Sequence, residues 1–422
     1  MVDKKEQSQS GNSHELPGDT NSPAKSENLT GAEQTAPKAS EGIPSGIRSL
    51  RDLINQVTGR NLSDLSDEGD AGLAELWPFP FLAMVGQERM KLGLLLALIN
   101  PAVGGVLLIG PRGTGKTTAV RSLIDLMPYV STSNCYYGCL EEDVEVGGID
   151  AICPNCVEKY SLNEPLSTRR PARLVELPLN STMEDVVGSV NERAAAHDRM
   201  RVRRGILSHA DKNILYIDEV NLLSDDVVDV ILDAAAQGSY TVRRYAVAAT
   251  YRERFTLIGT MNPEEGSLRP QIMDRFGLRL LVRGLSEPDD RLEAYRRSHA
   301  HFLNPRKVVD LYAEETLLAR DEVQAARDLL PQVELPAEVA KIGLGLIEDF
   351  NITSLRAEIT LFEAARALAS ADNRIVVTVD DLRQVSPMAL RLRRSKFIQK
   401  YFNDQTSEEE EIEDALKKLP KE

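Results

Sequence analysis

One short segment constrains the fold of this chain more than any other. It is the run from Gly110 to Thr117, GPRGTGKT, which directly follows the apolar segment 105–109. Its glycines let the backbone curl until successive N–H groups point inward, while Lys116 reaches the β and γ phosphates and the Thr117 hydroxyl is placed for Mg²⁺. A strand leading through such a loop into a helix predicts a nucleoside triphosphate site, whereas a chance Gly-rich turn lacks this context. The residues predicted to contact the nucleotide here are Gly110, Pro111, Arg112, Gly113, Thr114, Gly115, Lys116, Thr117 and Thr118.

A second apolar segment supplies two carboxylates. Residues 213–218 have the pattern of a buried strand, which ends in Asp218 and is followed by Glu219. In a hydrolysing site, Asp218 holds Mg²⁺ through its water shell and Glu219 polarises the attacking water. A solvated edge strand can end in the same two residues. Together with the phosphate loop, however, the pair predicts hydrolysis, because a site that only binds has less need of a base.

Two further polar residues follow a third predicted strand at 255–260. Asn262 comes just after this strand, and the carboxyl ends of parallel strands meet at the ligand crevice, so we expect it to bond the attacking water or the γ-phosphate. A plain Asn-Pro turn is the alternative. Arg275 stands beside Asp274 near the end of a helical segment. Two roles fit Arg275 at this position. It forms an intrachain salt bridge, or it presents its guanidinium group to the phosphates bound by a neighbouring subunit.

The composition indicates an acidic protein with no membrane-spanning segment. The chain has 422 residues, 42% of them hydrophobic, which is enough for two or three domains. Its net charge of -15 argues against a broad nucleic-acid footprint, which needs a basic face. No apolar run reaches the roughly 18 residues that a transmembrane helix needs, and no signal peptide is evident. We therefore expect a cytoplasmic protein.

The apolar pattern changes along the chain and predicts its organisation. Strands and helices alternate up to about residue 287, as in a parallel sheet covered on both faces, and helices alone follow. The predicted parts are a disordered tail (1–45), a linker with short helical segments (46–78), an α/β core (79–287) with insertions at about 131–205 and 238–253, a helical domain (288–395) and an acidic tail (396–422). The second insertion has the pattern of a β-hairpin with Arg243 and Arg244 at its turn. The helices predicted after the core span 289–299, 322–330, 336–349, 355–370 and 379–392.

The first 45 residues have almost no large apolar side chains, so they cannot offset the entropy of ordering. A transit peptide is the competing interpretation. The first arginine is Arg48 and acidic residues are frequent, which argues against it.

All four cysteines lie within the first insertion. Cys135 and Cys139 form one pair, and Cys153 and Cys156 form a second, tighter pair with the sequence CPNC. Two pairs at this separation have the spacing of a tetrahedral structural Zn²⁺ site, although the first pair is looser than a C-x₂-C knuckle. Ordinary reduced thiols and a redox-sensitive pair are the alternatives.

The order of these motifs resembles that of an AAA+ ATPase: a P-loop NTPase core with a parallel sheet flanked by helices, then a small all-α lid. The longer strings narrow the resemblance to the I subunit family of magnesium chelatase. They are Phe79-Pro80-Phe81, Ala83 to Gln87, Leu215 to Leu223, Val230 to Ala236, and Asn262-Pro263-Glu264-Glu265-Gly266-Ser267-Leu268-Arg269-Pro270 on to Gly277. The resemblance is strong over 79–285 and looser over 286–395.

The resemblance also implies roles for individual residues. ATP and Mg²⁺ are bound by the phosphate loop and Asp218, with Glu219 as the base and Asn262 as the first sensor. Arg275 is implied to be an arginine finger acting in trans, and Arg356, in Ser354-Leu355-Arg356-Ala357-Glu358, a second sensor that swings onto the nucleotide. Val85 and Gln87 are implied to lie against the adenine. The family assembles as a ring, commonly a hexamer, because each site needs the next subunit's arginine.

The family's activity is the ATP-driven insertion of Mg²⁺ into protoporphyrin IX in (bacterio)chlorophyll biosynthesis, together with two partners. One is a D subunit with a von Willebrand factor A domain, and the other is a porphyrin-binding H subunit. This chain has no Asp-x-Ser-x-Ser motif, so it is not the D subunit. A MoxR-type AAA+ remodeller that acts on another protein with a von Willebrand factor A partner is the rival interpretation, and the acidic charge disfavours a nucleic-acid motor.

Overall fold

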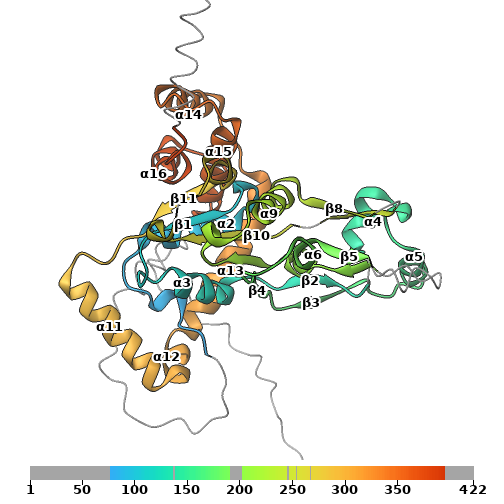
Figure 1. Ribbon diagram of the computed structural model, residues 1–422, viewed down its shortest axis with the longest axis horizontal. Helices are drawn as coiled ribbons and strands as arrows, with labels where there is room; N and C mark the ends of the chain where they lie inside the picture. Colours follow the sequence, from blue (N-terminus) through green and yellow to red (C-terminus); the bar gives the residue numbers. More distant parts are fainter. Residues whose placement is uncertain are drawn as a thin grey trace, which may run out of the picture. The chain divides into compact units, whose positions relative to one another are not determined.

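The structure is a computed structural model that describes residues 77–135, 138–190, 202–244, 247–252, 254–266 and 268–394 (Figure 1). The predicted N-terminal tail, nearly all of the predicted linker and the predicted acidic tail lie outside these residues. None of the described helices is both long and apolar enough to cross a membrane.

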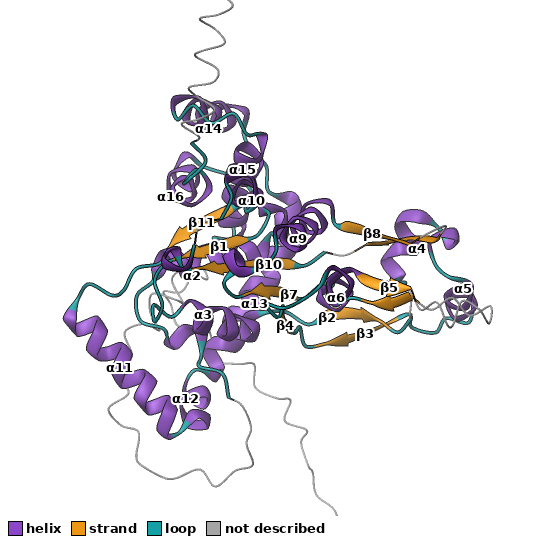
Figure 2. Ribbon diagram, viewed as in Figure 1, coloured by secondary structure: helices purple, strands orange, loops and turns teal. Residues whose placement is uncertain are grey.

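The centre of the fold is a five-stranded parallel sheet with the strand order β11-β1-β10-β7-β4 (Figure 2). Its strands are β1 (Val106–Ile109), β4 (Leu174–Glu176), β7 (Ile214–Ile217), β10 (Thr256–Met261) and β11 (Leu278–Leu281). The three strands expected from the sequence, at 105–109, 213–218 and 255–260, are confirmed to within one residue at each end.

Strand β10 lies between β1 and β7 and brings their ends together. The register pairs Ile109 with Met261 on one side of β10 and Ile217 with Gly259 on the other. All these pairs are parallel, so the carboxyl ends of the three strands meet at one edge of the sheet. Each of these strands is followed by residues that the sequence singled out.

The sheet is buried on both faces, which explains its continuous apolar strands. In β1, Val106 and Leu108 belong to one buried cluster, whereas Leu107 and Ile109 belong to the other. Successive side chains of a strand point to opposite faces, so each face needs its own cover. The first cluster includes residues of α2 (Glu88–Ile99) and α3 (Lys116–Ser122), and the second includes residues of α8 (Ile206–Ala210), α9 (Asp225–Gln237) and α10 (Pro270–Arg275).

Helices follow the sheet, as predicted. They are α11 (Pro288–Leu303), α12 (Pro305–Leu311), α13 (Ala313–Leu329), α14 (Ala337–Asp349), α15 (Leu355–Ala371) and α16 (Val379–Ala389). The sequence missed α12 and the first half of α13, where the buried side chains are few and partly small, such as Val308 and Ala319. Buried residues of α13 and α15 join the same cluster as those of α2, so the helical segment shares a core with the sheet.

The first insertion differs from expectation because β4, which lies within 131–205, is an edge strand of the main sheet. The rest forms two antiparallel strand pairs with short helices between them. The elements are β2 (Val130–Ser133), α4 (Glu141–Gly147), α5 (Pro154–Ser161), β3 (Ser167–Arg170), α6 (Met183–Val187), β5 (Gly188–Val190) and β6 (Val202–Arg204). Figure 1 shows α4 and α5 beyond the β2–β3 pair, away from α3.

The hairpin predicted at 238–253 is confirmed as β8 (Ser239–Arg244) paired with β9 (Val247–Arg252). The predicted position of its turn is wrong. Arg243 and Arg244 lie in β8, and Arg244 pairs directly with Val247, so both arginines belong to the strand and not to the turn.

Candidate functional site

The phosphate loop joins β1 to α3, and its backbone requires glycine. Gly113 and Gly115 have φ of 77° and 84°, in the left-handed region that side chains disfavour. A Cβ at Gly110 would lie 2.1 Å from the Val282 carbonyl oxygen. Lys116 is the first residue of α3, and its Nζ donates to the carbonyl oxygens of Gly110 at 2.8 Å and Pro111 at 2.7 Å. The ammonium group is thus held over the loop, where phosphates would lie.

Thr117 and Asp218 come together although they are far apart in the chain. The Thr117 hydroxyl lies 3.5 Å from Asp218 Oδ2, and the Tyr216 hydroxyl donates to Thr117 Oγ1 at 3.2 Å. Thr260, on β10, donates its hydroxyl to Asp218 Oδ1 and so orients the carboxylate. Carboxylate and hydroxyl oxygens are the ligands that Mg²⁺ prefers. The residues present therefore fit the predicted Mg²⁺ site, and Tyr216 and Thr260 are supporting residues that the sequence did not single out.

Glu219 has a strained backbone and a perturbed carboxyl. Its φ is 53°, and its backbone N–H donates to Thr260 Oγ1 at 3.0 Å. Non-glycine residues hold this conformation only when the surroundings enforce it, and such strain clusters at functional sites. Desolvation, followed by the hydrogen bond and charge of the Glu265 carboxyl, raises the pKa of Glu219 above its usual value. The Arg112 guanidinium forms ion pairs with both the Glu219 and the Glu265 carboxylates, and its Nη2 lies 3.5 Å from Glu219 Oε1.

Asn262 is buried beside the same carboxylates. Its Nδ2 donates to Glu265 Oε1 at 3.1 Å, and its Oδ1 accepts from the Glu264 N–H at 3.3 Å. The second bond caps the short turn that follows β10, so the Asn-Pro turn considered as an alternative is present. The first bond links Asn262 to the carboxylate that perturbs Glu219. Glu265 is the residue of this carboxylate group that the sequence did not single out, since its only signal was its position in an acidic pair after Asn262.

A cavity of about 530 Å³ opens beside the phosphate loop. Val85 and Gln87 line it together with Gly113 to Gly115 and Thr118 of the loop. This volume lies within the range of small-molecule pockets. The structure thus brings the two residues predicted to lie against adenine to the loop predicted to bind phosphate. Helix α11 contributes further lining residues that the sequence did not indicate: Arg291, Ala294 and Ser298.

Arg275 ends α10 and forms salt bridges to α9. Its Nη1 lies 3.1 Å from Asp229 Oδ1 and 2.9 Å from Asp233 Oδ1, which are one helical turn apart. The intrachain salt bridge considered from the sequence is therefore present, but its acceptors are on α9 and not at the adjacent Asp274. One quarter of the Arg275 side chain, 25%, remains exposed.

Asp274 joins α10 to the helical segment. Its carboxylate lies 3.2 Å from Arg279 and 2.8 Å from Arg393, both fully buried, and accepts a hydrogen bond from Ser354 at 2.8 Å. Burial pushes the pKa of Asp274 up, but the Ser354 bond and the two guanidinium groups outweigh it and hold the pKa below its usual value. Arg356 lies 3.9 Å from the same carboxylate. It is not among the described residues that line the cavity.

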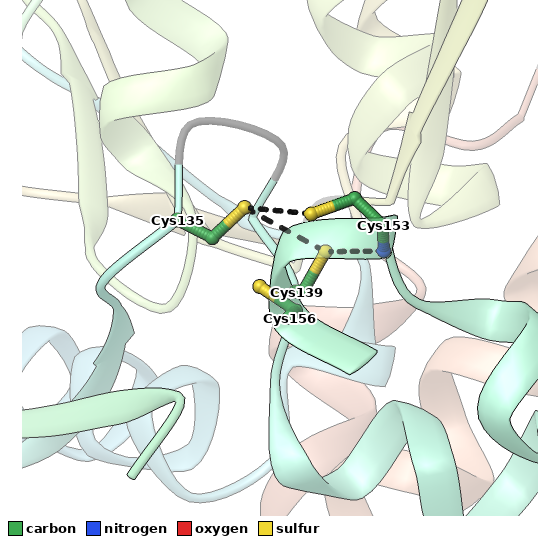
Figure 3. A group of neighbouring side chains, drawn as sticks. All are labelled: Cys135, Cys139, Cys153 and Cys156. Carbon is green, nitrogen blue, oxygen red and sulfur yellow. Dashed lines mark hydrogen bonds between the residues drawn. The ribbon is translucent and has the colours of Figure 1, made fainter. Parts of the chain in front are cut away.

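The four cysteines lie outside this site, and their side chains meet in the first insertion (Figure 3). None of these four described cysteines takes part in a disulfide. Cys139 and Cys156 are buried, and burial raises the pKa of the Cys139 thiol to about 11.

Comparison with known proteins identifies the family. The family model described as "Magnesium chelatase, subunit ChlI" matches residues 81–272. A magnesium-chelatase subunit ChlI homolog of Methanocaldococcus jannaschii is 41% identical, with 76% of this chain and 87% of that protein covered. The chain belongs to the magnesium chelatase subunit ChlI family. The magnesium-chelatase subunit ChlI of Synechocystis is 38% identical, and the match covers 75% of this chain and 88% of that protein. The magnesium-chelatase 38 kDa subunit of Acidiphilium rubrum is 39% identical, and the match covers 75% of this chain and 90% of that protein.

A second family model, "AAA lid domain", matches residues 348–415 of this ChlI-family chain. A solved chain from the complex between subunits BchI and BchD of magnesium chelatase is 35% identical, covers 77% of this chain and 99% of its own, and has a TM-score of 0.44. Together with the parallel sheet and the helices that follow it, the family matches confirm the predicted AAA+ α/β fold and an ATP-dependent chelatase ATPase subunit.

Proposed function

We propose that this chain is the ATP-hydrolysing ring subunit that drives insertion of Mg²⁺ into protoporphyrin IX, working with a D subunit and an H subunit. The observation that carries the proposal is the meeting of phosphate loop, Asp218, Glu219 and Asn262 at one sheet edge in a chain of the ChlI family. The family resemblance supports the two partners and the place in (bacterio)chlorophyll biosynthesis. We also propose that the subunit works in the cytoplasm.

The strand ends provide the hydrolytic half of the site. In our proposal Lys116 contacts the β and γ phosphates, while Thr117 and Asp218 hold the Mg²⁺ that accompanies ATP and supplies charge neutralisation when bound. Glu219 is the base, because it is the carboxylate next to the metal-binding one and its raised pKa suits proton uptake nearer neutral pH. Asn262 orients the attacking water. Val85 and Gln87 contact the adenine at the cavity.

The arginines provide the half of the site that depends on the ring. We propose that Arg275 leaves Asp229 and Asp233 and reaches the γ-phosphate bound by the next subunit. These two aspartates are about half exposed, so the pairing is weakly held and reversible. A guanidinium acting in trans makes hydrolysis depend on assembly, and we propose a homo-oligomeric ring, a hexamer, on the family resemblance.

The Asp274 contacts provide a route from nucleotide to lid. Arg356 at the start of α15 lies close to the carboxylate that also holds Ser354 and Arg393. We propose that Arg356 exchanges Asp274 for the nucleotide when the helical segment closes. Because Asp274 adjoins Arg275 in the chain, this exchange would also change the surroundings of Arg275. Closure and release around the ring would then be passed to the partner subunits through the insertions.

The test combines the purified chain with D and H subunits, ATP, Mg²⁺ and protoporphyrin IX. Formation of Mg-protoporphyrin, followed by its absorption and fluorescence, is the expected result. It should disappear when the chain carries Glu219→Gln and persist with Glu264→Gln, whose side chain is exposed one residue from Glu265. Vigorous ATP hydrolysis without any Mg-protoporphyrin, with active partners confirmed, would contradict the proposal and favour a MoxR-type remodeller.

A further inference from the structure

We propose that Cys135, Cys139, Cys153 and Cys156 bind one structural Zn²⁺ ion that fixes the end of the first insertion. The site would be a closed tetrahedral Cys₄ centre, separate from the nucleotide site. The name "cysteine module" is used below for residues 134–167, which contain the four thiols, α4 and α5.

The distances between the sulfur atoms match a tetrahedral zinc site. All four Sγ atoms lie within 4.8 Å of one another, and Cys135 Sγ is 3.8 Å from Cys139 Sγ and 3.5 Å from Cys153 Sγ. A tetrahedron with Zn–S bonds of about 2.3 Å places its sulfurs about 3.8 Å apart. A disulfide requires about 2.05 Å, and in a disulfide network the sulfurs would gather in pairs and not as a group of four. The arrangement therefore fits a shared cation better than two bridges.

The local backbone supports the cluster as a metal site. The Cys153 N–H donates to Cys139 Sγ at 3.3 Å, which is the kind of outer-shell bond that orients a thiolate ligand. Cys153 is the N-cap of α5, and Cys156 lies in its first turn after Pro154. Both sulfur ligands of the second pair are therefore presented by one turn at the N-terminal end of α5. The Ser133 hydroxyl accepts from the Cys135 N–H at 3.0 Å and donates to the Cys139 carbonyl, which fixes the first pair.

Among its described residues, the cysteine module has only a small core. Its buried cluster consists of Cys139, Ile152, Cys156 and Leu166, so two of the four residues of this cluster are thiols. Such a small core does not offset the ordering of a segment of this length, and small domains of this kind need disulfides or a metal. Binding Zn²⁺ would release four thiol protons to solvent and form four Zn–S bonds, with no change of oxidation state.

Two neighbouring side chains of α4 connect the cysteine module to its surroundings. Glu141 Oε1, from α4, accepts from the N–H groups of Leu166 and Ser167, which ties the module to β3. Glu142 lies 3.3 Å from Lys212, just before β7. Zn²⁺ would therefore hold α4, α5 and the start of β3 together, while leaving the nucleotide residues themselves untouched.

The first test measures metal content and coordination in the full chain. After purification under reducing conditions, mass spectrometry should find one zinc per chain, and replacement by Co²⁺ should give thiolate-to-metal charge transfer and the absorption of a tetrahedral ion. A chain that takes up neither metal after reduction and addition of one equivalent would overturn the proposal. So would thiols that oxidise reversibly in pairs even when one equivalent of Zn²⁺ is supplied, which would indicate a redox switch.

The second test uses variants. Cys135→Ser and Cys156→Ser, one from each pair, should each reduce zinc retained after gel filtration at least tenfold. Val157→Ala is the matched control, because it removes packing beside the cluster without removing a ligand, and it should keep full zinc. Zinc retained equally in both cysteine variants would mean that the metal binds elsewhere. If these variants do not fold, the unmodified chain loaded with Co²⁺ provides the test. A chelator that removes the Co²⁺ should abolish the thiolate-to-metal absorption, and absorption that was never present would contradict thiolate ligands.

Discussion

Two groups of predicted catalytic residues differ in how this chain holds them. The first group, at the strand ends, is assembled within one chain. Thr117 Oγ1 lies 3.5 Å from Asp218 Oδ2, and the Glu219 N–H donates a hydrogen bond to Thr260 of β10. The second group, Arg275 and Arg356, is occupied by carboxylates of its own chain. The difference teaches that one chain brings the predicted metal and base residues together by itself, whereas it holds Arg275 and Arg356 on its own carboxylates.

The physical cause lies in what supports each group. The strand ends are fixed by a sheet buried on both faces, and Thr260 of β10 bonds both the Asp218 carboxylate and the Glu219 backbone. The arginines stand at helix ends and are partly exposed, 25% for Arg275 and 47% for Arg356. Exposed ion pairs are worth about 0–1 kcal/mol, so a phosphate can compete for these side chains. The first group is suited to holding reacting atoms in a fixed position, and the second to exchanging one partner for another.

The largest expected effect comes from the strand-end group. Glu219→Gln should lower the rate of ATP hydrolysis by about 10²–10⁴-fold while ATP still binds, because only the base is lost. Phosphate release and nucleotide affinity measure the two quantities. Glu264→Gln, at an exposed position, is the control and should hydrolyse normally. Normal ATP hydrolysis by the Glu219→Gln variant would show that Glu219 is not the base.

A smaller effect is expected where the two groups join. Asp274→Asn should lower the free energy of unfolding by about 3 kcal/mol, because the fully buried Arg279 and Arg393 lose their counter-charge. Urea unfolding measures this, with exposed Asp150→Asn as the control. Since the pKa of Asp274 is held below its usual value, its contribution is present near neutral pH and is lost as the pH falls through that lowered pKa. An unchanged unfolding midpoint would mean that Asp274 does not hold α10 to the helical segment.

The smallest expected effect concerns the pH dependence of hydrolysis. The proposed base, Glu219, can accept a proton only when it is ionised, so its raised pKa should make the rate begin to fall at a higher pH than an ordinary glutamate would give. Glu265→Gln removes the neighbouring negative charge but keeps an oxygen for Asn262, so the acid limb should move to lower pH by less than about one unit. The pH profile of kcat measures the shift. An acid limb that stays in place or moves upward would contradict the coupling of these two carboxylates.

The sequence predicted the parts of the site whose position depends on local pattern. Apolar runs followed by the phosphate loop, by Asp218 and by Asn262 indicate parallel strands, and the carboxyl ends of such strands meet by necessity. Glu265 and Asp274 could not be predicted, because their roles come from contacts with residues distant in the chain. Strand β4 was hidden in an insertion because only three residues join the sheet. The hairpin turn was misplaced because Arg243 and Arg244 are equally compatible with strand and turn.

The measurement that tests the account most directly is complementation between two inactive chains. Arg275→Ala keeps an intact phosphate site, and Lys116→Ala keeps an intact finger, so each should be nearly inactive alone. Mixed in equal amounts, they should recover hydrolysis at about a quarter of the subunit contacts, those where an intact site meets an intact finger. No recovery in assemblies shown to contain both chains would contradict a site completed by the neighbouring subunit's arginine.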